Sequence, residues 1–293
     1  MISTGKGQSS LNGFTLSNLE IPITEVKRGG PPRDGIPSID QPKFDSSLES
    51  TLSGNQRVLG VTFNGVSKAY PINIMNWHEI VNDTFDNHPV VITYCPLCGS
   101  GVSFDALIDS QKTTFGVSGL LYNSDVLLYD RQSQSLWSQI KMQGISGQQS
   151  GKHLKYINTS NTTWSAWRKE YPNTLVLSEE TGFTRNYDQS PYSTYMLSDQ
   201  LMFPINKNNP ILANKELVTG INIGSEYKAY PHSVLKKKKE DIIDQLGGKT
   251  IIVRYDNRAQ STIVEGKSGK IIPSVQLYWF AWYAFHPNTS IYK

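Results

Sequence analysis

The stretch that decides the fold is Val58-Leu59-Gly60 with Lys68-Ala69-Tyr70-Pro71, which recurs as Val218-Thr219-Gly220 with Lys228-Ala229-Tyr230-Pro231. Both parts of the second copy lie 160 residues after the first (218 − 58 and 228 − 68), so no gap separates them. Such spacing indicates an internal duplication. Duplicated segments keep the residues that the fold needs, so positions that differ between the copies are candidates for function.

A second pair of segments extends the repeat. Trp164-Ser165-Ala166-Trp167 leads to Tyr171-Pro172-Asn173-Thr174, and Trp279-Phe280-Ala281-Trp282 leads to His286-Pro287-Asn288-Thr289. Both tryptophans are shared, whereas Tyr171 is replaced by His286. Two interpretations stay open: His286 is a metal ligand that only the second copy has, or tyrosine and histidine serve there as equivalent amphipathic packing residues.

The repeats also predict local structure. Val58 to Phe63, Asn64-Gly65 and Ser67 to Ile72 predict a hairpin with an Asn-Gly turn. Helix-like stretches follow at 74–81 and 233–246, and strands follow at 90–94 and 250–255. The two anchors are 106 residues apart in the first copy (164 − 58) and 61 in the second (279 − 218), so the first copy carries a strand-rich insertion of 45 residues that includes most of 115–131.

These patterns predict a β-rich α+β fold in which two pseudo-equivalent halves pack face to face as one compact unit. We expect an irregular arm rich in proline and glycine at 1–50, a first repeat at 51–176, a connector at 177–217 and a second repeat at 218–293. The Pro/Gly-dense stretch of the arm is Gly29 to Pro37, which is either a linker or a segment laid across the domain.

The bulk composition narrows the function classes. The 293 residues carry a formal net charge of +3, and the one basic run, Lys236 to Lys239, is followed at once by Glu240 and Asp241. This run is typical of the solvated face of a helix rather than of a nucleic-acid patch. No apolar run reaches transmembrane length. Met1 to Asn12 contains no apolar signal segment, whereas abundant Tyr, Ser, Asn and Thr favour an extracytoplasmic location.

The two cysteines of the chain lie in Cys95-Pro96-Leu97-Cys98-Gly99, where the second copy has Asp256-Asn257-Arg258-Ala259. This spacing allows a metal site, a thioredoxin-like redox dithiol or an inert disulfide. A thioredoxin-like motif begins a helix, but here Gly99-Ser100-Gly101 predicts a turn that returns to a strand. A turn between strands favours metal binding.

Further ligands are needed for a metal. His78, which precedes the strand in Asn76-Trp77-His78-Glu79, and His286 in its aromatic surroundings are the best candidates. Two thiolates with two imidazoles suit copper best and zinc as a second choice. Glu79, Asp130 and Arg131 are the candidate catalytic or ligand-supporting residues, although Asp130-Arg131 also fits an ion pair at a strand end. Asp125 and Asp34 are other polar candidates.

Several long motifs resemble a known family, domain of unknown function 3179. The motifs are Asn76 to Asp83, Thr93 to Gly99, Phe115 to Gly119, Tyr129 to Arg131, Ser135 to Gln139, Phe280 to Pro287 and Gly29 to Pro37. The resemblance extends over nearly the whole chain. It implies bacterial and archaeal relatives, many of them exported, and it implies no activity.

The first hypothesis is therefore an extracytoplasmic copper protein with an oxidoreductase or electron-transfer role. Cys95, Cys98, His78 and His286 would bind the metal, and a small polar substrate or a redox partner protein would meet it. The alternatives are a metal-free thiol–disulfide protein with Cys95 as the attacking thiol, and a non-catalytic surface-binding module in which a disulfide staples the turn.

Overall fold

The repeated segments form the same antiparallel hairpin in both copies. In the computed structural model, which describes residues 9–293, β5 (Arg57–Phe63) pairs with β6 (Val66–Pro71), and β19 (Leu217–Ile223) pairs with β20 (Glu226–Pro231). Asn64 and Gly65 both have positive φ, at 49° and 77°, as a two-residue type I′ turn requires. The predicted Asn-Gly hairpin is confirmed.

Packing explains why both copies keep the same glycine and the same tryptophan. A Cβ atom on Gly60 would lie 2.2 Å from Cε3 of Trp167, and one on Gly220 would lie 2.2 Å from Cε3 of Trp282. The indole nitrogens of these tryptophans donate to Thr174 and Thr289, at 3.0 and 2.8 Å. The hairpin therefore packs directly on the following helix, and a side chain at either glycine would separate them.

Each copy builds two sheets. The first has the strand order β17-β5-β6-β18 or β24-β19-β20-β25, and β4 adds to the edge of the former. The second is β16-β9-β8-β7 or β21-β22-β23. In the first copy, the bounds in chain order are β4 (Phe44–Ser46), α1 (Ile72–His78), β7 (Ile80–Phe85), β8 (His88–Cys95), β9 (Ser100–Asp105), β16 (Tyr156–Ile157), β17 (Thr159–Thr163), α2 (Trp164–Glu170) and β18 (Leu175–Leu177). In the second copy, they are α4 (His232–Leu235), β21 (Ile242–Leu246), β22 (Lys249–Asp256), β23 (Ser261–Gly266), β24 (Ser274–Tyr278), α5 (Trp279–Phe285) and β25 (Ser290–Ile291).

The insertion of the first copy forms a fifth sheet, with the order β15-β14-β13-β12-β3. Its outer strand β3 comes from the N-terminal segment and pairs with β12. Smaller elements complete the chain. The bounds are β3 (Val26–Arg28), β12 (Phe115–Tyr122), β13 (Asp125–Asp130), β14 (Leu136–Ser138), β15 (Gln143–Ser146), the hairpins β1 (Ser9–Leu11) with β2 (Phe14–Leu16) and β10 (Leu107–Ile108) with β11 (Gln111–Lys112), the 3-10 helix η1 (Ile23–Glu25) and α3 (Ser193–Leu197).

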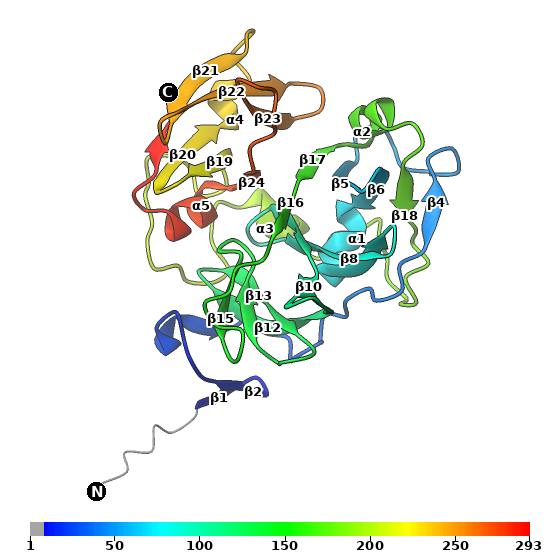
Figure 1. The fold of residues 1–293 in the computed structure, drawn as a ribbon, viewed down its shortest axis with the longest axis vertical. Coiled ribbons are helices and arrows are strands. Elements are labelled where there is room, and N and C mark those ends of the chain that lie inside the picture. The colour runs from blue at the N-terminus through cyan, green and yellow to red at the C-terminus, as the bar shows by residue number, and fades with distance from the viewer. Residues whose placement is uncertain (1–8) are drawn as a thin grey trace, which may run out of the picture.

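The five larger sheets make a five-bladed β-propeller, with 43% of residues in strands and 12% in helices (Figure 1). The predicted α+β fold of two packed halves is therefore wrong. Each repeat supplies two sheets instead of one half of a two-layer fold, and the insertion supplies a sheet of its own. The α-helices have four to seven residues each and lie between strands, so they form no layer.

The helix predicted at 233–246 is also wrong. The helix α4 ends at Leu235, and Ile242–Leu246 forms β21 instead. Burial there alternates, with Ile242 and Leu246 buried and Ile243 exposed, which is the period of a strand. The basic run Lys236–Lys239 is exposed as expected, but it lies after the helix and not on its face.

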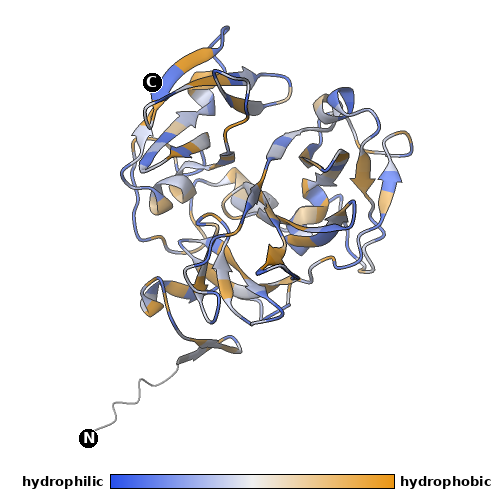
Figure 2. Cartoon of the chain, in the orientation of Figure 1, coloured by the Kyte–Doolittle hydropathy of each residue, from blue (hydrophilic) through white to orange (hydrophobic). Residues whose placement is uncertain are grey.

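The segment before the first repeat lies across several sheets. β3 borders the sheet of the insertion, the buried Ile39 bridges to Val81 of β7, and β4 borders the β5–β6 sheet. Residues 1–8, which hold most of the segment examined for a signal peptide, lie outside the described residues. In the described part of the chain, no helix is long and apolar enough to cross a membrane, and Figure 2 shows polar and apolar residues mixed along the strands.

Candidate metal centre

The cysteines lie in a tight turn between two antiparallel strands. Cys95 is the last residue of β8, Ser100 is the first of β9, and the Cys98 amide donates to the Cys95 carbonyl at 3.2 Å. Gly99 has φ of 63°, and its α-carbon faces the ring of Tyr278. The predicted turn between strands is confirmed, and the helix start that a thioredoxin-like motif would need is not found there.

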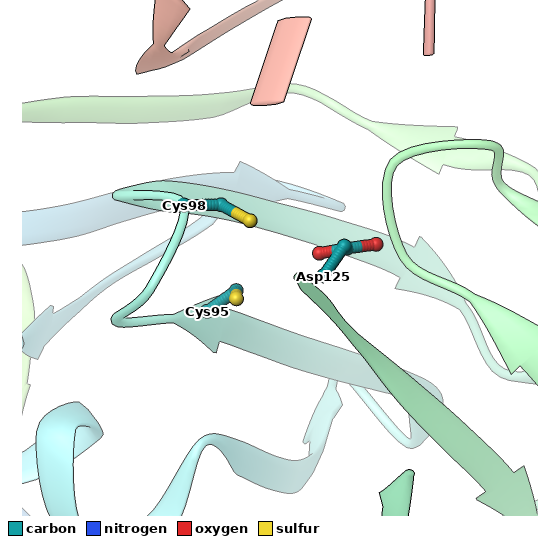
Figure 3. A group of neighbouring side chains, drawn as sticks. All are labelled: Cys95, Cys98 and Asp125. Carbon is teal, nitrogen blue, oxygen red and sulfur yellow. The ribbon is translucent and has the colours of Figure 1, made fainter. Parts of the chain in front are cut away.

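A second turn brings a carboxylate to the thiols. Asp125 opens β13 directly after Asn123 and Ser124, which both have positive φ (52° and 63°) and make the β12–β13 hairpin turn. The Ser124 carbonyl accepts from the thiols of Cys95 and Cys98, at 3.8 and 3.5 Å. One ligand atom from each of Cys95, Cys98 and Asp125 lies within 4.8 Å of the other two (Figure 3).

The group is sealed from solvent. Cys95 is 1% exposed, and Cys98 and Asp125 are 0% exposed. Burial raises the pKa of both thiols and raises the pKa of Asp125 to about 7. Asp125 Oδ2 accepts the amide of Ile140 at 3.1 Å, whereas its buried Oδ1 has no hydrogen-bond partner of normal geometry, and the two thiols are close enough to the carboxyl to offset part of that rise in pKa. An orphaned carboxylate oxygen beside two thiols is unusual, because buried polar atoms are normally satisfied.

Glu79 adjoins this group. It follows α1 with a left-handed φ of 57°, is 6% exposed, and accepts a hydrogen bond from the Tyr192 hydroxyl at 3.4 Å. Burial raises its pKa to about 8, and the negative charge of Asp125 adds to the shift. Within residues 9–293, neither Glu79 nor Asp125 forms a salt bridge with lysine, arginine or histidine. The acidic groups therefore have no cation of the protein to balance them.

Other parts of the chain hold the cysteine turn in place. The Tyr278 amide of the second repeat donates to the Cys98 carbonyl at 2.8 Å, and the Tyr195 hydroxyl of the connector donates to the Leu97 carbonyl at 2.9 Å. The Ser124 hydroxyl donates to the carbonyl of Phe203 at 2.8 Å. The two turns are thus fixed by backbone contacts from both repeats, the insertion and the connector.

The two predicted histidine ligands do not belong to this group. His78 is buried, and its ring nitrogens bond the Pro37 carbonyl at 2.8 Å and the Tyr187 hydroxyl at 2.7 Å. His286 stacks on Tyr227 and lies tilted by 52° against Trp282, with ring centroids 4.3 and 4.2 Å apart. Tyr171 lies against Trp167 at the same centroid distance of 4.2 Å, tilted by 36°, so each residue packs on the tryptophan of its own copy.

Of the predicted catalytic residues, Glu79 alone lies beside the cysteines. Asp130 accepts from the Ser133 amide and hydroxyl and, at 2.9 Å, from the Trp137 indole. Arg131 bonds Ser38 at 2.8 Å and forms a salt bridge with Asp40 at 3.0 Å. Both residues sit at the other end of β13 from Asp125 and have structural partners. Asp34 accepts the Tyr129 hydroxyl at 2.6 Å, which likewise fixes the arm.

A family model described as "Protein of unknown function (DUF3179)" matches residues 33–270. The chain belongs to this family. The match runs from the N-terminal segment through the cysteine turn, the inserted sheet and both repeated hairpins, so the DUF3179 region contains Cys95, Cys98, Asp125 and Glu79. Neither a curated protein nor a solved structure matches the chain.

Asp125 is the residue that sequence reasoning did not assign as a ligand. It was one polar residue among several in the insertion, and spacing alone cannot show that the tip of one hairpin meets the tip of another. One signal was available. Asp125 closely follows Asn123, a residue type enriched at positive φ, and is followed by the apolar run Val126-Leu127-Leu128. An acid at the start of a fully buried strand must have a partner.

Proposed function

We propose that Cys95, Cys98 and Asp125 bind one metal ion, and that this family member is a metalloprotein. The observation that carries the proposal is the meeting of two hairpin tips that leaves three ligand atoms within 4.8 Å and one carboxylate oxygen without a partner. Tetrahedral zinc with ligand bonds of about 2.0–2.3 Å needs ligand atoms roughly 3.3–3.8 Å apart. The spacing of the three groups is compatible with that requirement.

Zinc fits this set of donors best. The copper expectation depended on two imidazoles, and neither His78 nor His286 belongs to the group. Two thiolates and a carboxylate are ordinary zinc ligands, and a divalent cation would balance acidic groups that have no other cation. Glu79 stands beside the group as a further carboxylate, either as a ligand or as support for one.

A metal-free redox dithiol is a weaker proposal for these cysteines. Attacking thiols in such proteins are partly exposed and have a lowered pKa, often at the start of a helix. Here both thiols are buried, their pKa is raised by burial, and the motif joins two strands.

Copper with an electron-transfer role is the second candidate. Two buried thiolates suit copper(I). Burial raises the pKa of the phenols of Tyr94, Tyr192, Tyr195 and Tyr278, and the nearby cysteines raise it further. Because Cys95, Cys98 and Asp125 are buried, such a site would exchange electrons rather than bind a substrate at the metal.

The test is elemental analysis of protein purified without chelator and then loaded with zinc or with copper. We expect one ion per chain in the wild type, and less than about 0.2 ion per chain in Cys95→Ser and Asp125→Asn. His286→Ala, which removes a predicted ligand outside the group, is the matched control and keeps its metal. Wild-type protein without metal after both loadings would overturn the proposal, and preferential retention of copper would favour the second candidate.

A further inference from the structure

A cavity of about 480 Å³ lies between the inserted sheet and the β19–β20 sheet. Its lining includes Tyr122 from β12, the turn residues Lys141 and Met142, and Tyr227, Trp282 and His286 from the second repeat. The volume is that of ordinary small-molecule sites. The metal group is not among its lining residues, so the cavity is a separate place in the molecule.

Several residues that line the cavity differ from their counterparts in the first copy. His286 corresponds to Tyr171, Tyr227 corresponds to Ser67, and Asn222 corresponds to Thr62, and all three second-copy residues line the cavity. In the first copy, the Thr62 and Ser67 hydroxyls bond each other at 2.9 Å on the exposed hairpin. The shared Gly220 and Trp282 hold the hairpin against the helix, so the framework is kept while the side chains facing the cavity have changed.

Aromatic side chains and one lysine are among the residues that line the cavity. His286 lies against Tyr227 with an interplanar angle of 17°, and Tyr122 meets Phe285 edge to face at 5.2 Å. Among residues 9–293, the cavity lining contains neither aspartate nor glutamate. The ammonium of Lys141, which is half-buried, has no salt bridge or hydrogen bond in the described part of the chain. Burial and the nearby Lys141 charge lower the pKa of His286 to about 4, which keeps the imidazole neutral.

The backbone at the cavity wall is strained as well. Met142 has φ of 54°, a left-handed value that a non-glycine residue rarely adopts, and it is held by the Leu154 amide donating to its carbonyl at 2.8 Å. This conformation places the neighbouring Lys141 and Met142 at the wall.

We infer that this cavity binds a small organic anion with a planar apolar body, the carboxylate of an aromatic acid being the simplest form. The planar body would pack among the rings of Tyr227, Trp282 and His286, and the anionic group would pair with Lys141. The site does not depend on the metal proposed above.

The test uses benzoate as the anionic probe and benzamide as its neutral counterpart, with binding followed by calorimetry and by Trp fluorescence. We expect benzoate to bind the wild type at millimolar concentration or better, and Lys141→Met to weaken it about tenfold. Benzamide should bind more weakly and be indifferent to Lys141→Met. Lys112→Met, at an exposed lysine of β11, is the control that leaves benzoate binding unchanged.

Two further variants, His286→Tyr and Tyr227→Ser, introduce the residues of the first copy and so suit the hairpin and helix geometry. Each should weaken benzoate binding while thermal unfolding shows a folded protein. The inference is overturned by wild-type protein that does not bind benzoate, or by Lys141→Met binding it as the wild type does. Binding is measured with and without zinc, so failure of the metal proposal would not alter this result.

Discussion

The protein interior strongly changes the pKa of His232. Its side chain is 2% exposed, its Nε2 lies 3.0 Å from the Thr219 hydroxyl, and its ring meets Tyr255 edge to face at 5.0 Å. Burial, together with the positive charges of Arg57 and Lys236, lowers its pKa to about 3. In the unfolded chain the same group has a pKa of about 6.5. The folded state therefore holds a neutral imidazole that the unfolded state would protonate.

Because the folded pKa lies below the unfolded one, this contribution to stability is complete above about pH 6.5 and is lost as the pH falls toward 3. The loss is about 1.4 kcal/mol for each pH unit in that window. Between pH 7 and pH 5, urea unfolding should show the wild type losing about 2 kcal/mol more than His232→Gln does. His153→Gln, at an exposed histidine, should lose as much as the wild type. Equal losses in all three proteins would mean that folding does not lower the pKa of His232.

Residue by residue, the sequence predicted the parts of the candidate site that lie on one stretch of chain. Cys95, Cys98 and the adjoining Glu79 come from consecutive elements, so their proximity follows from local structure. Asp125 joins them only through packing of one sheet tip on another, which spacing does not reveal. His286 was expected from the difference between the copies. The copies do differ at this position, but His286 lines a cavity whose lining contains none of Cys95, Cys98 and Asp125.

In each copy, a lysine and a tyrosine of one sheet bind an aspartate of the neighbouring sheet, and this Lys–Tyr–Asp group acts as a brace between the two sheets. Lys68 of β6 binds both carboxylate oxygens of Asp83 of β7 at 2.9 Å, and the Tyr70 hydroxyl donates to Asp83 at 2.5 Å. In the second copy, Lys228 and Tyr230 bind Asp244 at 2.6 and 2.7 Å. The first brace is more deeply buried, with side chains 9% and 5% exposed against 18% and 17%.

This difference predicts unequal effects of the same substitution. Asp83→Asn leaves a buried lysine without its counter-charge and should lower the free energy of unfolding by about 3–5 kcal/mol. Asp244→Asn should cost no more than about 1–2 kcal/mol, because water reaches Lys228. Chemical denaturation of the two single variants measures both values. Similar costs for the two would show that burial does not set the strength of the brace.

Individual strands and turns were predictable from the sequence where neighbouring residues gave a clear pattern. The Asn-Gly turn and the alternation along β5 and β6 identify the hairpin, and the glycines after Cys98 identify the turn into β9. The lysine run at 236–239 was misleading, because it suggested one long helix where the chain leaves a short helix and enters β21. The fold class was not predictable in the same way. Strand counts do not reveal which strands share a sheet, and a sheet from the insertion has no counterpart in the second repeat.

At the scale of the whole molecule, the N-terminal segment holds three blades together. β3 extends the inserted sheet, β4 extends the β5–β6 sheet, and between them Ile39 exchanges backbone hydrogen bonds of 2.9 Å with Ile80 and Asn82 around β7. Ile39 is 0% exposed and packs in the same apolar cluster as Leu59 and Val81. A segment whose proline and glycine content would suit a linker therefore contributes to the core.

Ile39→Ala should lower the free energy of unfolding by about 2–5 kcal/mol, since it removes a fully buried side chain at the junction of sheets and leaves a cavity. Ile23→Ala, in the same segment but 38% exposed, should change it by no more than about 0.5 kcal/mol. Thermal and urea unfolding of the two variants decide between the alternatives that the sequence left open. If the segment were a linker, both substitutions would be equally mild. A large cost confined to Ile39 would mean that closure of the ring of blades depends on the chain before the first repeat.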